Sequence, residues 1–121
     1  MPRKADPLTR LRKLCLALPE TTEKVAWNRP TFRVRDKMFG LFADNFHDDG
    51  RVALWCSSPR DVRDILVEFD PDRFFVPPYF GPRGWLGVYL DGKLDWDELH
   101  EVIKDGYRQV APKRLSALVD D

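Results

Sequence analysis

The sequence predicts an α+β fold in which one helix, an antiparallel β-sheet and further helices follow one another, with the helices packed on one face of the sheet. Three observations predict this fold. An amphipathic helical pattern opens the chain, short strand-like runs with breaks too brief for a crossover come next, and helical patterns then return. The 121 residues contain no dividing linker, so we expect a single domain spanning residues 1–121.

The first helix is predicted to follow Asp6 and to stop before Pro19. Asp6 is a good N-cap, and Pro7 occupies the first helical position, where its missing N–H is harmless. Pro19 cannot continue the helix beyond Leu18. An apolar stripe at i, i+3, i+7 and i+10 is expected to face the core, formed by Leu8, Leu11, Cys15 and Leu18.

Four short runs predict the strands, at residues 25–27, 31–35, 38–43 and 51–55. Residues 28–30 are interpreted as a turn or bulge, and Asp36-Lys37 as a two-residue hairpin break. The third run is apolar on both faces, which is typical of a central or covered strand. Because the breaks are so short, consecutive strands are expected to pair antiparallel.

The second half of the chain predicts three helices and one more strand. Ser58 should cap a helix that buries a stripe formed by Val62, Ile65, Leu66 and Phe69. Residues 85–90 are interpreted as the last strand. Asp95 and Glu98 resemble a capping box for the third helix, whose apolar stripe runs to Val110. Residues 112–119 should form a short final helix.

Composition restricts the function classes. Twenty basic and twenty acidic residues cancel, which argues against a strongly basic nucleic-acid binder, but residues 24–37 hold five cations and one anion. No run of 18 apolar residues predicts a membrane span, and no apolar signal core follows Met1, so we expect a cytoplasmic protein. Cys15 and Cys56 are expected to be buried thiols, and no metal-ligand spacing is present.

Several short motifs follow one another in a specific order. They are residues 18–23 (LPETTE), Trp27, 30–34 (PTFRV), 37–39 (KMF), 73–75 (RFF), 78–79 (PY), 84–88 (GWLGV) and 111–115 (APKRL). Together they resemble the MmcQ/YjbR family of small bacterial proteins, over a core of about residues 6–118. The resemblance implies a curved antiparallel sheet of the CyaY-like or secretion-chaperone-like type. It also implies DNA binding by a "double wing" of two β-hairpins, and it supplies no catalytic residue.

The first candidate site is the hairpin that would form one wing. Its outward cations are expected to be Arg33, Arg35 and Lys37, with Arg29 at its base. Arg33 and Arg35 should point the same way because strand side chains alternate, and at about 7 Å apart they match the spacing of phosphates along a strand. The simpler alternative is that a charged, solvated sheet face does nothing further.

The second candidate site is the segment 74–88, in which five aromatic residues, three prolines and three glycines surround Arg83. Tyr79, Phe80 and Trp85 could stack on bases beside Arg83. The alternative is that these aromatic residues complete the core beneath a proline-braced loop. Lys113 and Arg114, in the first turn of the last helix, could hold an anion or could simply be solvated.

Three functional hypotheses follow. The first is a DNA-binding module, salt-sensitive and weakly specific, that uses the basic hairpin and the aromatic segment. The second is a protein-interaction or chaperone-like module. The third is a binder of a small anionic ligand near Arg83. The sequence contains no identifiable acid, base or nucleophile set, so we expect neither catalysis nor a cofactor nor a metal.

Overall fold

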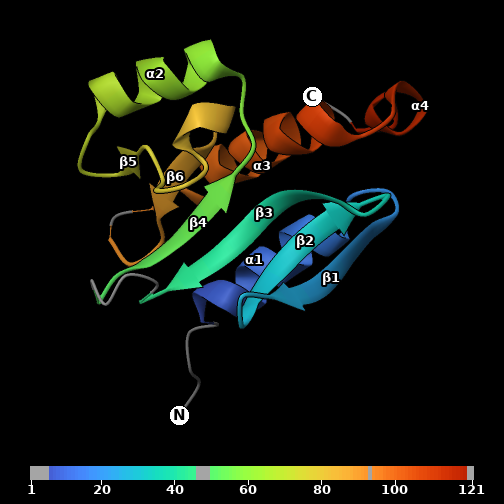
Figure 1. Cartoon of the computed structure of the whole chain (residues 1–121), viewed down its shortest axis with the longest axis horizontal. Coiled ribbons are helices and arrows are strands. Elements are labelled where there is room, and N and C mark those ends of the chain that lie inside the picture. The colour runs from blue at the N-terminus through green and yellow to red at the C-terminus, as the bar shows by residue number, and fades with distance from the viewer. Residues whose placement is uncertain (1–5, 46–49, 93, 120–121) are drawn as a thin grey trace.

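The computed structural model describes residues 6–45, 50–92 and 94–119 (Figure 1). It contains the predicted helices and strands in the predicted order, together with a short strand at residues 74–75 that was not predicted. The helices and strands are α1 (Pro7–Leu16), β1 (Thr21–Ala26), β2 (Arg29–Val34), β3 (Lys37–Asp44), β4 (Val52–Cys56), α2 (Arg60–Phe69), β5 (Phe74–Phe75), the 3-10 turn η1 (Gly81–Arg83), β6 (Leu86–Tyr89), α3 (Trp96–Val110) and α4 (Lys113–Ser116). Among the described residues, no helix is both long and apolar enough to cross a membrane.

The six strands form one sheet in the order β1-β2-β3-β4-β6-β5, and every neighbouring pair is antiparallel. Figure 1 shows the sheet as a curved surface with α1 and α3 lying against one side. The predicted α+β class and antiparallel pairing are therefore confirmed. The third predicted strand, β3, is central in the sheet, which explains why its sequence is apolar on both faces.

The hairpin turns differ by one or two residues from the prediction. Trp27-Asn28 joins β1 to β2 and Arg35-Asp36 joins β2 to β3, and all four residues have positive φ, between 51° and 66°. Such two-residue turns suit the right-handed twist of the flanking strands. The predicted turn at 28–30 and the break at Asp36-Lys37 were therefore wrong. Arg29 and Pro30 belong to β2, and Arg35 lies in a turn.

The side of the sheet that faces α1 and α3, called here the helix face, carries the larger core. Leu11 of α1, Phe32 of β2 and Tyr107 of α3 are fully buried there. The ring of Phe39 packs edge-on against Tyr107, with centroids 5.5 Å apart, where the β2–β3 register shifts by one residue. Cys15 and Cys56 are free thiols buried in the same core, as predicted.

The opposite side of the sheet, called here the loop face, is covered by the aromatic segment and not by a helix. Leu41, Ala43, Ala53, Trp55 and Trp85 form a second buried cluster there. Phe80 packs on this cluster from the loop that links β5 to β6. The prediction that helices pack on one face is thus confirmed, and the aromatic loop fills the position that a second helical layer would occupy.

The predicted burial of α2 was wrong for Ile65 and Phe69, although Leu66 does pack against the helix-face core. Ile65 and Phe69, which were expected in the core, are 64% and 78% exposed, while Arg63 on the same helix is buried. The helix also begins one residue later than expected, at Arg60. Pro59 is its N-cap, and the Ser58 side chain does not cap it. By contrast α3 begins as predicted, with the Asp95 carboxylate accepting hydrogen bonds from two backbone N–H groups.

Candidate functional site

The structure separates the predicted site residues into two groups at different places. Arg29 and Arg33 lie on the loop face of β2, the same side of the sheet as the aromatic loop. Arg35 and Arg114 lie instead around Glu20, at the end of the β1–β2 hairpin opposite Trp27-Asn28. The sequence predicted Arg29, Arg33 and Arg35 as parts of one basic hairpin, and the fold separates Arg35 from the other two.

The loop face of β1 and β2 is cationic. Lys24 is paired with Thr31, and Thr31 with the buried Leu41 of the loop-face cluster, so Lys24 and the alternating residues Arg29 and Arg33 all point to that face. Within these two fully described strands, the acidic residue is Glu23. It faces the helices, where its carboxylate accepts a hydrogen bond of 2.6 Å from Arg12 of α1.

The three cations are spaced along the two strands. Arg29 and Arg33 are four residues apart on β2, which corresponds to about 13 Å. Lys24 lies opposite Thr31, the residue midway between them, on the neighbouring strand. Each neighbouring pair of Cα atoms is therefore about 8 Å apart, and the Arg33 guanidinium is oriented by a hydrogen bond of 3.2 Å to the Thr31 hydroxyl.

The aromatic loop combines a buried support with exposed residues. Trp85 is 3% exposed, and its ring stacks on Phe80 with centroids 4.7 Å apart. The Arg83 guanidinium lies 5.5 Å from the Phe80 centroid and 5.7 Å from that of Trp85, within the range of a cation–π contact. Tyr79, with a positive φ of 67°, is 72% exposed. Trp85 is thus a core residue, whereas Tyr79 and Arg83 are exposed at the surface.

Two arginines of α2 hold the aromatic loop in place. Arg63 donates a hydrogen bond of 2.7 Å to the Gly81 carbonyl, and Arg60 donates one to the Pro82 carbonyl. These bonds fix the 3-10 turn that carries Arg83. No side-chain pattern in the sequence reveals this role, because the partners are backbone carbonyls 18 and 22 residues away.

Trp27 is the functional candidate that the site prediction omitted. Its ring is 62% exposed at the Trp27-Asn28 turn and meets the Phe80 ring edge-on, with centroids 6.1 Å apart. A tryptophan followed by asparagine between two strand-like runs was the available sequence signal, since asparagine tolerates positive φ. The contact brings the tip of the β1–β2 hairpin against the aromatic loop.

The second group of cations is held by one carboxylate. Glu20 accepts a hydrogen bond of 2.7 Å from Arg35 and lies 3.5 Å from the Arg114 guanidinium. The hydrogen bond from Arg35 lowers the pKa of Glu20, and the same contact raises the pKa of Arg35. The prediction that Arg33 and Arg35 point the same way was therefore wrong, because Arg35 leaves the strand at the turn.

Lys37 also lies apart from the loop face. It pairs with Val34, whose side chain is buried among the helix-face residues, so Lys37 points toward the helix side of the sheet. Lys113 is exposed beside Arg114 at the start of α4.

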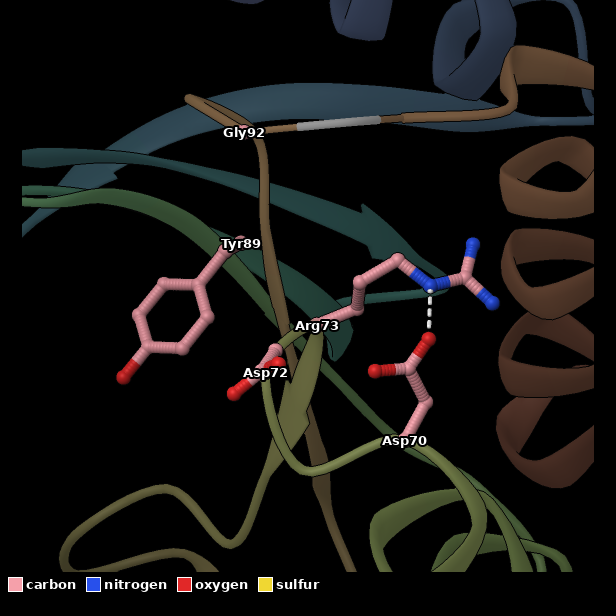
Figure 2. Close-up of a pocket in the computed structure, with 5 residues that line it drawn as sticks. All are labelled: Asp70, Asp72, Arg73, Tyr89 and Gly92. Carbon is pink, nitrogen blue, oxygen red and sulfur yellow. Dashed lines mark hydrogen bonds and ion pairs between the residues drawn. The ribbon is translucent and has the colours of Figure 1, made fainter.

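A pocket of about 360 Å³ lies near the end of β6. Its arginine, Arg73, is not free to bind an anionic ligand. Figure 2 shows its lining residues Asp70, Asp72, Arg73, Tyr89 and Gly92, with the Arg73 side chain turned away from Tyr89. Arg73 is already paired with Asp70 at 2.6 Å and with Glu98 at 3.1 Å.

Tyr89 in this pocket is equally engaged. Its ring stacks on Phe75 at 4.5 Å, and the Arg51 guanidinium lies 3.7 Å from its centroid. Arg73 and Tyr89 are therefore both already engaged by neighbouring side chains.

The protonation of the two cysteines and the placement of metal-binding side chains can be read from the described structure. Burial raises the pKa of Cys56 to about 12 and also raises that of Cys15, so both thiols stay protonated at neutral pH. Across residues 6–45, 50–92 and 94–119, no group of three histidine, cysteine, aspartate or glutamate residues is placed to hold a metal ion.

Solved structures share this fold, among them one from Deinococcus radiodurans and one from Pseudomonas syringae. Protein DR2400 from Deinococcus radiodurans, described as having a DUF419 domain, is 21% identical with a TM-score of 0.74, and the match covers 88% of this chain and 80% of that one. A Pseudomonas syringae protein is 15% identical with a TM-score of 0.70, covering 88% of this chain and all of that one. At these identities the similarity demonstrates the fold. No functionally curated protein matches the chain.

The sequence itself identifies the family. The YjbR family model matches residues 16–109, which include all six strands and nearly all of α3. This range contains the cationic strand face, the Trp27 turn and the aromatic loop. The chain therefore belongs to the YjbR family.

Proposed function

We propose that this protein binds DNA, preferring single strands, through a cationic–aromatic face and without a catalytic step. This face comprises Lys24, Trp27, Arg29, Arg33, Tyr79, Phe80 and Arg83. The observation that carries the proposal is the exposed Trp27 ring, held against Phe80 at the end of a strand face that presents three cations. The protein would bind DNA in the cytoplasm.

Each part of the face has a distinct task. Lys24, Arg29 and Arg33, at spacings of about 8 Å, contact phosphates along one strand, and Arg33 can engage a phosphate bidentately. Trp27 and Tyr79 offer rings on which bases can stack, and such stacking tolerates any base sequence. Unpaired bases are available for stacking, whereas those of a duplex are not, so the exposed rings favour single strands.

The salt dependence follows from the number of phosphates contacted. Three contacts to single-stranded DNA give a slope of about −2 in a plot of log K against log salt concentration. The neutral net charge of the chain means that little further attraction acts at long range. Binding is therefore expected to be modest and strongest at low salt.

The test is fluorescence anisotropy of a labelled 20-nucleotide oligo(dT) and of a labelled duplex, each titrated at two salt concentrations. We expect Lys24→Gln/Arg33→Gln to weaken single-strand binding by about tenfold at low salt, since two phosphate contacts are lost. The matched control, Arg35→Gln/Arg114→Gln, removes the same charge near Glu20 and should change the affinity less than twofold. Equal losses in both variants would contradict the assignment of the face.

Trp27 provides a test that does not depend on charge. We expect Trp27→Ala to weaken oligo(dT) binding by about tenfold, within the range measured for loss of one base–aromatic stack, with the salt slope unchanged. Because the ring is 62% exposed, the variant should keep its circular dichroism spectrum. Wild-type affinity in a folded Trp27→Ala variant would show that Trp27 does not stack on DNA.

A further inference from the structure

The outward side of α2 carries an apolar stripe without a counterpart in the described chain. Val62, Ile65 and Phe69 are spaced at i, i+3 and i+7, which places them along one side of the helix. Ile65 and Phe69 are 64% and 78% exposed. Leu66, which adjoins the stripe at i+4 from Val62, and Val67 pack against the helix-face core. The sequence pattern of a buried helix surface is thus present, but the fold turns it to solvent.

The position of α2 explains why the stripe stays uncovered. Figure 1 shows α2 at the margin of the molecule, beyond the short edge strand β5. The helix is fastened from its inward side, where Arg63 reaches the Gly81 carbonyl and Arg60 the Pro82 carbonyl. These bonds fix its rotation about its own axis. The stripe therefore faces outward because of how α2 is attached.

The border of the stripe is acidic. Asp61, Asp64 and Glu68 are exposed, and by helical geometry they lie along one flank of Ile65. The helix has two cations, Arg60 and Arg63, and both are directed to the aromatic loop. The Asp64 carboxylate is partly offset by Arg63 at 2.9 Å. The outward side of α2 is consequently apolar along its centre and negative along one edge.

We infer that this side of α2 docks a partner protein through a basic amphipathic helix. An apolar stripe with i, i+3 and i+7 positions is the arrangement by which one helix binds along another. The acidic flank selects lysine and arginine beside the partner's apolar residues and repels acidic ones. A second copy of this chain is a poor occupant, because antiparallel pairing of two α2 helices would place like charges around the same contact.

The docking surface is chemically opposite to the cationic–aromatic face proposed for DNA. One surface is negative and apolar and the other is positive and aromatic, so each attracts what the other repels. The inference does not rest on DNA binding and extends the role of the chain to a second partner. With few anchoring side chains, the complex is expected to be weak and to depend on salt.

The experiment uses the ¹⁵N-labelled full chain and a 15-residue probe peptide with leucines at helical spacing flanked by lysines. A second peptide carries glutamate in place of each lysine. We expect the lysine peptide to shift backbone amide signals centred on α2. Ile65→Ser/Phe69→Ser should weaken its binding at least tenfold, and Asp61→Asn/Glu68→Gln at least threefold. The glutamate peptide should leave the spectrum unchanged.

The matched control is Leu118→Ser, which removes another apolar side chain that is 62% exposed and should leave the affinity within twofold. The inference is overturned if both peptides bind equally, if the shifts lie away from α2, or if neither double variant weakens binding. It is also overturned if sedimentation shows that the free chain dimerises and that Phe69→Ser abolishes the dimer, because a second copy would then occupy the surface.

Discussion

The contacts that a cationic side chain makes decide whether it belongs to the cationic–aromatic face, and neighbouring cations differ in these contacts. Arg35 and Arg33 are two residues apart, yet Arg35 is bound to Glu20 while Arg33 is oriented by the Thr31 hydroxyl on the loop face. A pattern of alternating charges cannot reveal this difference, because it depends on which residue begins the β2–β3 turn. The positive φ of Arg35 marks that residue.

The two cysteines give a prediction at the scale of single residues. Cys15 and Cys56 are each 1% exposed, and burial raises the pKa of both thiols. Because the thiolate is the reactive form, we expect the native protein to show almost no reaction with a disulfide reagent such as DTNB at neutral pH. Two thiols should react after denaturation. Rapid reaction of either thiol in the native state would contradict the burial seen here.

Packing between elements depends on residues that allow close approach. A Cβ atom at Gly106 of α3 would lie 2.5 Å from the Ser57 carbonyl oxygen. The Ser57 hydroxyl donates a hydrogen bond of 2.7 Å to the Gly106 carbonyl, so helix and strand end are joined at this point. A glycine within a helix ordinarily lowers its stability, and its presence here follows from the contact with β4.

We therefore expect Gly106→Ala to lower the free energy of unfolding, although alanine favours a helix by about 1 kcal/mol. Moving the helix away from the Ser57 backbone should cost about 1–3 kcal/mol. Urea denaturation followed by circular dichroism measures the difference. The control is Gly92→Ala, where a Cβ atom would meet nothing within 4 Å. A Gly106→Ala variant more stable than wild type would show that helix and strand separate without cost.

The attachment of the aromatic loop to α2 gives a second prediction at this scale. Arg63 is buried and donates to the Gly81 carbonyl at 2.7 Å. Arg63→Ala should lower the free energy of unfolding by about 2 kcal/mol, because a hydrogen bond from a charged donor is lost and a carbonyl is left without it. Arg60→Ala, at an exposed position, should cost less. Urea denaturation compares the two, and equal effects would contradict a special role for Arg63.

At the scale of the whole molecule, two buried thiols and one buried tyrosine hydroxyl predict that the protein loses stability at alkaline pH. Desolvation raises the pKa values of Cys15 and Tyr107, and that of Cys56 rises to about 12 from an ordinary 9.0. At a pH between the ordinary pKa of each group and its raised pKa in the folded protein, the folded protein keeps a proton that the unfolded chain releases. Stability is therefore unaffected by these groups below about pH 9 and falls as the pH rises above it.

Each such group should contribute up to about 1.4 kcal/mol per pH unit to this fall. Urea denaturation at several pH values between 8 and 11 measures the slope. The Cys56→Ala variant, although less stable overall, should show a shallower decline because one of the proton-retaining groups is gone. A stability that stays constant up to pH 11 would contradict the burial of these groups.

The order of the elements could be predicted from sequence because its signals are local. Asp6 and Asp95 cap helices through their own backbone neighbourhoods, and short breaks between strands enforce antiparallel pairing. The apolar residues on both faces of β3 likewise indicated a covered central strand. These features act within a few residues, so the amino-acid sequence alone determined the α+β class and the buried thiols.

Tertiary structure alone decided which side of α2 is buried and which cations share a surface. The periodicity of Ile65 and Phe69 marks an apolar side, but the bonds from Arg60 and Arg63 to the aromatic loop turn that side outward. Similarly, the contact between Trp27 and Phe80 joins segments more than 50 residues apart. Such contacts depend on long-range geometry, which a local pattern does not contain.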